Sequence, residues 1–153
     1  MAQSKTITYS VKVEPDGARR WYLNEVLHRE DGPAVEDADG TREWYIDGRC
    51  HREDGPAIED AGGSKFWYIN GQRHRDDGPA VECVLDEIKE WFCNGKRHRT
   101  DGPAVEYNNG SKQWWLEGVQ FSEADFLKKT KKSTSCTGKI VVIEGKRYQL
   151  TEV

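Results

Sequence analysis

The chain has 153 residues, of which 33% are charged and 35% hydrophobic, and its mean hydropathy is −0.90. Six Trp, six Tyr and four Phe supply apolar side chains for a core, so the composition argues against a disordered chain. The net charge of −4 divides unevenly: residues 1–120 contain 16 basic and 23 acidic side chains, and residues 121–153 contain 7 and 4. An acidic first part without a basic stripe argues against direct binding to nucleic acid.

The predicted structure begins with a strand. Residues 6–13 alternate in polarity and are rich in β-branched side chains, which is typical of a strand. Pro15, Asp16 and Gly17 then predict a turn. We interpret residues 6–20 as a half-repeat cap, because a terminal repeat has an edge to protect.

A repeat dominates residues 1–120. Its aromatic pairs begin at Trp21, Trp44, Trp67, Trp91 and Trp114. Successive pairs are therefore 23, 23, 24 and 23 residues apart. Between them the segment His-Arg-x-Asp-Gly-Pro-Ala-Val/Ile-Glu recurs at 28–36, 51–59, 74–82 and 98–106. A fixed period of this length predicts an array of stacked supersecondary units.

Each unit predicts a β-hairpin. One short strand follows the proline and a second contains the aromatic pair, with Asp-Gly or Asn-Gly between them to accept a positive φ at low cost. Proline at 33, 56, 79 and 103 suits the first position of a strand. The predicted fold is mainly β: an elongated antiparallel meander of about ten short strands, built from 23-residue hairpin repeats.

The pattern changes after residue 120. Ser122, with Asp125 three residues later, predicts the cap of one short helix within 121–132 that ends in lysines. Residues 133–138 are a predicted polar linker, and residues 139–153 predict a C-terminal β-hairpin about Glu144 and Gly145. An isolated hairpin is only marginally stable, so we expect it to pair with the array, the helix or a second copy, as a homodimer.

Strand alternation sorts the repeat into two faces. The tryptophans, together with the valine or isoleucine of Ala-Val/Ile-Glu, are expected to form the core face. The opposite face is expected to carry an aromatic and acidic stripe, namely Tyr22, Tyr45, Tyr68, Phe92, Trp115, Glu36, Glu59, Glu82 and Glu106. Such a stripe is a second packing layer, which we favour because periodic aromatics are mostly structural, or an exposed recognition surface.

The His-Arg-x-Asp-Gly segment invites a metal-binding or acid–base interpretation. However, its titratable residues recur at the period of the array, namely His28, His51, His74, His98, Asp31, Asp54, Asp77 and Asp101. A catalyst needs one set of groups in one pocket, whereas every copy here is equal. We therefore interpret the aspartates as hydrogen-bond acceptors for the backbone amides of their own turns. We interpret the histidines as contacts between adjacent units. The sequence predicts no catalytic residue, no metal site and no cofactor.

The third unit is irregular between residues 83 and 88. The segment there lacks the glycine of the other turns and is one residue longer than they are. We expect a distorted or longer loop there. Its residues are a candidate contact site, although folding back onto the array explains them at least as well; they are Val84, Leu85, Asp86 and Glu87.

The cellular compartment follows from cysteine usage and hydropathy. The four cysteines show no Cys-x-x-Cys spacing and suit a reducing cytoplasm. The sequence predicts no export signal and no membrane-spanning stretch. The basic helix has only Phe126 and Leu127 on its apolar face, too little for a membrane anchor. We expect a cytoplasmic protein.

The repeat resembles a known family. The unit Gly-x-x-His, a short strand, Asp/Asn-Gly and an aromatic pair, as in residues 71–74, 109–110 and 114–115, is similar to MORN repeats, and more closely to the MORN-like variants of bacterial and bacteriophage proteins. The likeness covers residues 13–120. It departs from the common MORN pattern because His-Arg-x-Asp-Gly-Pro-Ala is longer and contains proline. The resemblance implies an elongated sheet of hairpins that serves as a binding or dimerisation platform.

The His-Arg-Glu-Asp-Gly-Pro-Ala form, followed by a Ser-Glu-x-x-Phe helix, also resembles small accessory proteins of tailed bacteriophages. That resemblance implies a non-enzymatic module that binds and blocks a host protein, such as a defence nuclease, in the host cytoplasm. An acidic array complements the basic nucleic-acid-binding surface of such a host protein. Two alternatives stay open: a sink for a nucleotide messenger, and a structural oligomerisation scaffold. An enzymatic function is the least favoured of the hypotheses.

Overall fold

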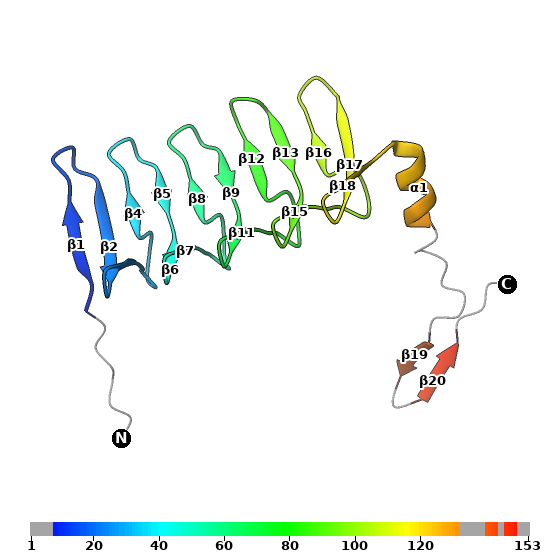
Figure 1. Ribbon diagram of the computed structural model, residues 1–153, viewed down its shortest axis with the longest axis horizontal. Coiled ribbons are helices and arrows are strands. Elements are labelled where there is room, and N and C mark those ends of the chain that lie inside the picture. The colour runs from blue at the N-terminus through cyan, green and yellow to red at the C-terminus, as the bar shows by residue number, and fades with distance from the viewer. Residues whose placement is uncertain (1–7, 132–139, 144–145, 150–153) are drawn as a thin grey trace.

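A computed structural model describes residues 8–131, 140–143 and 146–149 (Figure 1). The protein is mainly β, with one short helix, as the sequence predicts. Figure 1 shows successive hairpins side by side along the long axis, from β1 (Ser10–Val13) at one end to β18 (Val119–Phe121) at the other. Residues 6 and 7 of the first predicted strand lie outside the described residues.

The units build one open antiparallel sheet of twelve strands. Hairpins follow one another in chain order, and each pairs edge to edge with the next. Between β1 and β18 the strands are β2 (Arg19–Leu23), β3 (Val26–Leu27), β4 (Val35–Glu36), β5 (Arg42–Glu43), β8 (Ile58–Glu59), β9 (Lys65–Phe66), β12 (Val81–Cys83), β13 (Ile88–Glu90), β16 (Val105–Glu106) and β17 (Lys112–Leu116). We call the paired strands of this sheet the long hairpins.

A second row of hairpins runs along one border of this sheet (Figure 1). These short hairpins are β6 (Tyr45–Ile46) with β7 (Arg49–Cys50), β10 (Tyr68–Ile69) with β11 (Gln72–Arg73), and β14 (Phe92–Cys93) with β15 (Lys96–Arg97). The prediction of one continuous strand through each aromatic pair is therefore wrong for the three middle units. Trp44 N–H donates to Ala57 O just before β8, and its carbonyl accepts from His51 N beyond the short hairpin. Trp21 makes the same two bonds, but β2 stays continuous because β1 pairs with it along its other edge.

The short hairpins close with two-residue turns in which both residues have positive φ, as at Asp47 (49°) and Gly48 (73°). This is the turn geometry that matches the twist of a two-residue hairpin. Neighbouring short hairpins are also joined, because Gly71 N donates to Cys50 O at 2.8 Å and Arg52 N donates to Tyr68 O at 3.1 Å. Each 23-residue unit thus contributes one hairpin to each of two rows.

The core is thin and periodic. The alanine after each repeat proline is completely buried, and the valine that follows it is buried in three units; they are Ala34, Ala57, Ala80, Ala104, Val35, Val81 and Val105. Ala57 shows why the side chain is small: its N–H donates to Phe66 O and its carbonyl accepts from Trp44 N, both at 2.8 Å. With two neighbouring backbones this close, a larger side chain would overpack the array.

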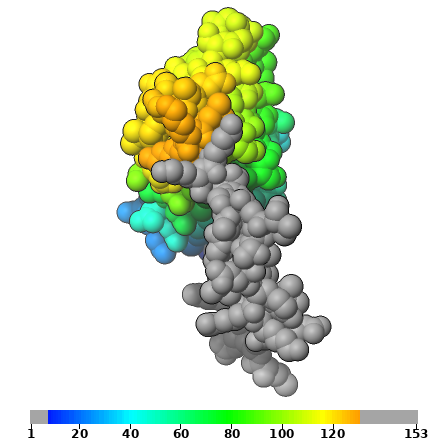
Figure 2. Space-filling view, turned by 90° about the vertical axis from the view of Figure 1, so that its right-hand side faces the viewer, coloured from blue at the N-terminus to red at the C-terminus, as the bar shows by residue number. Residues whose placement is uncertain are grey.

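Helix α1 (Glu123–Lys131) closes the C-terminal end of the array. Ser122 caps it, because its Oγ accepts from Asp125 N at 3.2 Å and donates to Asp125 Oδ2 at 2.8 Å. Phe126 is buried, and the helix contacts β17 and β18. Figure 2, which faces this end, shows the helix lying against the last strands. The helix predicted within 121–132 is confirmed.

The C-terminal hairpin is also confirmed. Strand β19 (Ile140–Ile143) pairs antiparallel with β20 (Lys146–Gln149), in a register that runs from Ile140 opposite Gln149 to Ile143 opposite Lys146. Its predicted turn at Glu144 and Gly145, and the predicted linker 133–138, lie outside the described residues.

Candidate functional site

We call the four copies of His-Arg-x-Asp-Gly-Pro-Ala the crossing segments. The first leads from β3 to β4, and the other three lead from a short hairpin to the next long hairpin. Their arginine folds inward. Arg52 stacks 4.0 Å from the ring centroid of Trp44, its Nε donates to Asp54 Oδ1 at 2.8 Å, and its Nη1 donates to Pro56 O at 3.2 Å and to Glu59 Oε1 at 3.3 Å. The same contacts recur about Arg29, Arg75 and Arg99.

These contacts explain the composition of the crossing segment. A Cβ on Gly55 would lie 3.0 Å from Arg52 Cζ, so a larger residue there would require the guanidinium to shift from its place on Trp44. The hydrogen bond from Arg52, and then its charge, hold the pKa of Asp54 below its ordinary value of 3.8. The aspartates were expected to bind turn amides. Instead their main partner is the arginine, and the pKa values of Asp31, Asp77 and Asp101 are lowered in the same way.

The histidine of each crossing segment contacts the next unit. His51 Nδ1 accepts the backbone N–H of Asn70 at 3.1 Å, and the ring reaches across 19 residues of sequence to do so. The equivalent bonds join His28 to Asp47, His74 to Asn94 and His98 to Glu117, each at 3.1 Å. His51 Nδ1 also lies 3.1 Å from Asn70 Oδ1, so the tautomer decides whether Nδ1 accepts from the amide or donates to the side-chain oxygen. His51 Nε2 faces Glu53 Oε1 at 3.7 Å.

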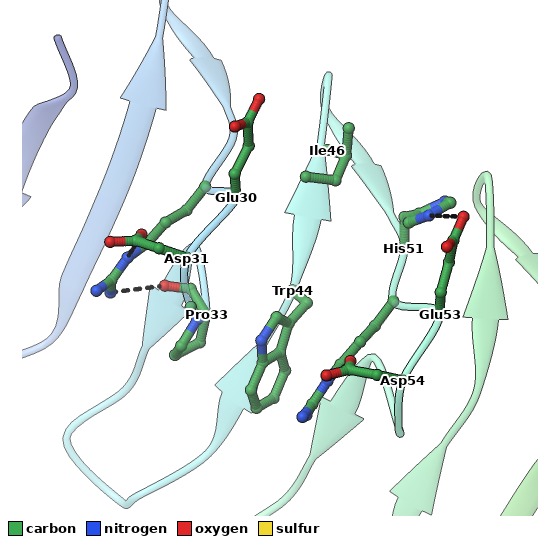
Figure 3. A pocket seen from close by; sticks show the side chains of 11 residues that line it. Glu30, Asp31, Pro33, Trp44, Ile46, His51, Glu53 and Asp54 are labelled. Carbon is green, nitrogen blue, oxygen red and sulfur yellow. Dashed lines mark hydrogen bonds and ion pairs between the residues drawn. The ribbon is translucent and has the colours of Figure 1, made fainter. Parts of the chain in front are cut away.

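Three grooves lie between successive crossing segments, with volumes of about 590, 730 and 600 Å³. Figure 3 shows the first groove, with Trp44 between Pro33 of one crossing segment and Asp54 of the next, and with Ile46 further up, between Glu30 and His51. Trp67 with Ile69, and Trp91 with Cys93, occupy the same places in the second and third grooves. The grooves are thus repeated at the period of the array.

The grooves are acidic. Two arginines and four carboxylates line each of the first two, whereas Thr100 replaces one carboxylate in the third. We call these carboxylates the acidic row; all are exposed, and they are Glu30, Asp31, Glu53, Asp54, Asp76, Asp77 and Asp101. Because the arginines are held by partners within the chain, the surface presented to solvent is negative.

The two faces of the sheet differ from the sequence prediction. Val35 is paired with Glu43, and Tyr45 Oη donates to Glu43 Oε2 at 2.9 Å, so the valine lies with the tyrosine. Glu36 is instead paired with Arg42. The arginine that stacks on Trp21 also donates to Glu36, which places this glutamate with the tryptophans.

A common stripe of the tyrosines with Glu36, Glu59, Glu82 and Glu106 is therefore wrong. Alternation defines the faces of one strand, but the register between strands decides which faces match. From here we use "tryptophan side" for the face with the stacked arginines, the grooves and the acidic row. The other face, with Tyr22, Tyr45, Tyr68, Phe92 and Trp115, is the "tyrosine side".

The tyrosine side is occupied by the chain's own side chains. Phe92 is buried against Ala80 and Val81, whereas the tyrosines and Trp115 are half-buried. Arg73 Nε donates to Tyr68 Oη at 3.1 Å, and the guanidinium of Arg97 lies over both Phe92 and Trp115. These contacts describe a packing layer.

Burial also shapes the chemistry of that side. It raises the pKa of Tyr45, and it raises the pKa of the Cys50 thiol to about 12. The thiol is therefore protonated near neutral pH and is a poor nucleophile.

The irregular loop of the third unit forms a four-residue turn. The extra residue lengthens the β12–β13 ladder by one pair, Cys83 opposite Ile88. Of the two predicted outcomes, a distorted or a longer loop, the longer loop is therefore wrong. Val84 is anchored through its N–H, which donates to Ser64 Oγ at 3.1 Å. Leu85 does not fold back, because 83% of its surface is exposed.

Within the ranges that the structure describes, no group of three or more His, Cys, Asp or Glu side chains is placed to hold a metal ion. In the same ranges no helix is long and apolar enough to cross a membrane. A comparison with models of protein families found no match, and neither did a comparison with curated proteins. The resemblance to MORN repeats is therefore a hypothesis that the repeat pattern alone supports.

Proposed function

We propose that this chain is a non-catalytic protein-binding module and that the acidic row on its tryptophan side contacts a basic surface of a partner protein. The observation that carries the proposal is the series of grooves in which exposed carboxylates outnumber arginines and the arginines have partners within the chain. Complementary charge of this kind steers association and fixes orientation.

The charge of the grooves favours a protein partner over an anionic ligand. A nucleic-acid backbone or a nucleotide messenger needs free cationic groups, but Arg52 and Arg75 each donate to a carboxylate, a proline carbonyl and a glutamate. An incoming phosphate would meet the carboxylates first. The nucleotide sink is therefore the weaker alternative.

Binding also accounts for the repetition better than catalysis does. A general acid or base works best with a pKa near the operating pH, whereas hydrogen bonds from arginine lower the pKa values of the groove aspartates. Similar grooves in series suit a surface that binds more strongly through several contacts at once.

The proposal takes its most specific form in an inhibitory role. A partner that binds nucleic acid through a basic surface would be blocked when the acidic row occupies that surface. This is the mode of action expected from the resemblance to phage accessory proteins, with a host nuclease as the partner class. The MORN-like pattern of the repeat supports a platform role in the same way.

A second contact surface is proposed at the irregular turn. Val84 and Leu85 are exposed there, and Asp86 and Glu87 follow them. An apolar tip on an acidic array would supply the desolvated contact that charge pairs alone lack.

Affinity capture from a bacterial lysate with two matched variants tests the proposal. The first variant neutralises the acidic row (Glu30→Gln, Glu53→Gln, Asp76→Asn). The second removes the same charge at exposed positions outside the grooves and the irregular turn (Asp16→Asn, Glu25→Gln, Asp39→Asn). We expect a basic protein to bind in stoichiometric amount, to be released by salt, and to be lost only with the first variant.

Equal retention by both variants would contradict the acidic row as the binding surface. Loss with the second variant alone would move the binding surface from the grooves to the turns that carry those three residues. Inhibition is tested by asking whether this chain and nucleic acid compete for the captured partner. An absence of competition would contradict the inhibitory role.

A further inference from the structure

The grooves repeat at a spacing that selects the shape of what they bind. Each unit adds two strands to the main sheet, and neighbouring strands lie about 4.8 Å apart, so equivalent points recur about every 9.6 Å. The three grooves are lined by equivalent positions of the repeat, although in the third Cys93 replaces isoleucine and Thr100 replaces a carboxylate. A partner that fills all three must therefore present equal side chains at that interval.

Few polypeptide conformations do so. In a β-strand, side chains on one face recur about every 6.7 or 13 Å, and in an α-helix every seventh residue gives about 10.5 Å. A polyproline II segment repeats its orientation every third residue, at about 9.3 Å. Over the two intervals between three grooves the helix is about 2 Å too long, whereas the polyproline II segment fits within about 1 Å.

The lining of the grooves suits such a segment. Trp44 faces Pro33 across the first groove, and polyproline II segments dock in aromatic-lined grooves. The carboxylates on both walls, Glu30 and Asp31 on one and Glu53 and Asp54 on the other, select a cationic side chain at the point of entry.

We propose that the three grooves bind three successive cationic side chains of one extended polypeptide segment that carries arginine or lysine at every third position. This inference rests on the proposed function, because it specifies the partner of the acidic row. It adds a spacing rule, which a general attraction between opposite charges does not impose.

Thr100 gives the rule an internal test. It occupies the place that Glu30, Glu53 and Asp76 hold in the other crossing segments, so the third groove has one carboxylate fewer. Thr100→Asp would complete that groove. Asn108→Asp adds the same charge at an exposed position in the loop between β16 and β17, outside the grooves, and is the matched control.

The experiment uses peptides of identical composition, made of arginine, alanine and proline, in which arginine recurs every second, every third or every fourth residue. Binding to the full chain is measured by fluorescence anisotropy at low salt. We expect the peptide with arginine at every third position to bind at least about tenfold more tightly than the other two, because only it engages the grooves together. Thr100→Asp should tighten its binding about threefold, and Asn108→Asp should not.

Equal affinities for the three peptides would overturn the spacing rule, as would equal effects of Thr100→Asp and Asn108→Asp. Failure of the rule is distinguishable from failure of the proposed function. If all peptides bind equally and Glu53→Gln with Asp76→Asn weakens all of them, the acidic row binds basic segments without regard to spacing. If no peptide binds but partner capture still depends on the acidic row, the extended segment is wrong and the protein-binding surface stands.

Discussion

The tryptophan side and the tyrosine side come from the same repeat, and both combine aromatic rings with arginines. On the tyrosine side Arg73 and Arg97 lie among Tyr68, Phe92 and Trp115, and the buried valines complete a packing layer. On the tryptophan side the arginines also stack on rings, but carboxylates remain exposed beyond them. Periodic aromatics therefore identify structure on both sides, and only the remaining charge distinguishes a surface suited to binding.

The largest expected loss of stability comes from disrupting the packing layer of the tyrosine side. Phe92→Ala removes the largest side chain of the cluster with Ala80 and Val81 and should lower the free energy of unfolding by about 3–5 kcal/mol. Urea unfolding followed by tryptophan fluorescence measures this. Leu85→Ala, at an exposed turn, is the control and should change stability by less than about 0.5 kcal/mol. A similar loss in both variants would mean that the tyrosine side is not a packing layer.

The next effect concerns the stacked arginines of the tryptophan side. Arg75→Ala removes bonds to Asp77, Pro79 and Glu82 and the contact with Trp67, and should destabilise the chain by about 2–3 kcal/mol. Arg75→Lys should recover little, since an ammonium cannot reproduce the planar fork.

Arg49→Ala, which removes an arginine that is exposed, is the matched control for Arg75 and should be close to neutral. Thermal unfolding of the three variants, compared with the unmodified chain, provides the measurement. Full recovery by Arg75→Lys would contradict the role assigned to the guanidinium geometry.

A smaller loss of stability is expected when the contact between neighbouring units is removed. His51→Ala leaves the Asn70 amide without its Nδ1 acceptor and should cost about 1 kcal/mol, and His51→Asn should recover part of this because its side-chain oxygen can accept the same bond. Amide hydrogen exchange should accelerate at Asn70. The Asn94 amide, which His74 holds, is the internal reference. Unchanged exchange at Asn70 would contradict the interpretation that His51 connects neighbouring units.

Acid should weaken the crossing segments. The pKa values of Asp54 and Asp77 are lowered in the folded chain, so their contribution to stability is complete above the ordinary value of 3.8 and is lost as the pH falls through the folded values. The melting temperature should therefore fall below about pH 4. The double variant Asp54→Asn and Asp77→Asn should show a flatter dependence in that window. Parallel curves would contradict the assignment.

The smallest effect on stability sharpens the comparison most. Neutralising Glu30, Glu53 and Asp76 together should change the free energy of unfolding by about 1 kcal/mol or less, because these side chains are exposed. Partner binding should nevertheless be lost. Urea unfolding of the variant used for capture provides the measurement. A large loss of stability would show that the acidic row is structural, like the tyrosine side.

The third unit shows how far sequence patterns extend to local geometry. The sequence located the irregularity at residues 83–88, but not its outcome, because one extra residue can lengthen either a loop or a ladder. The structure lengthens the ladder, which leaves Leu85 at an exposed tip. The grooves also escaped sequence analysis, although the residue before each repeat aspartate is acidic in three of the four crossing segments.

The sequence by itself determined the period, the helix cap and the C-terminal hairpin, because each depends on residues close together in the chain. Ser122 with Asp125 is local in this sense. Only the tertiary structure decided the sides of the sheet and the second row of hairpins. Val35 faces Glu43 and Trp44 changes its hydrogen-bond partners because of contacts with neighbouring units, and the pairing register that sets these contacts is not encoded in the alternation of one strand.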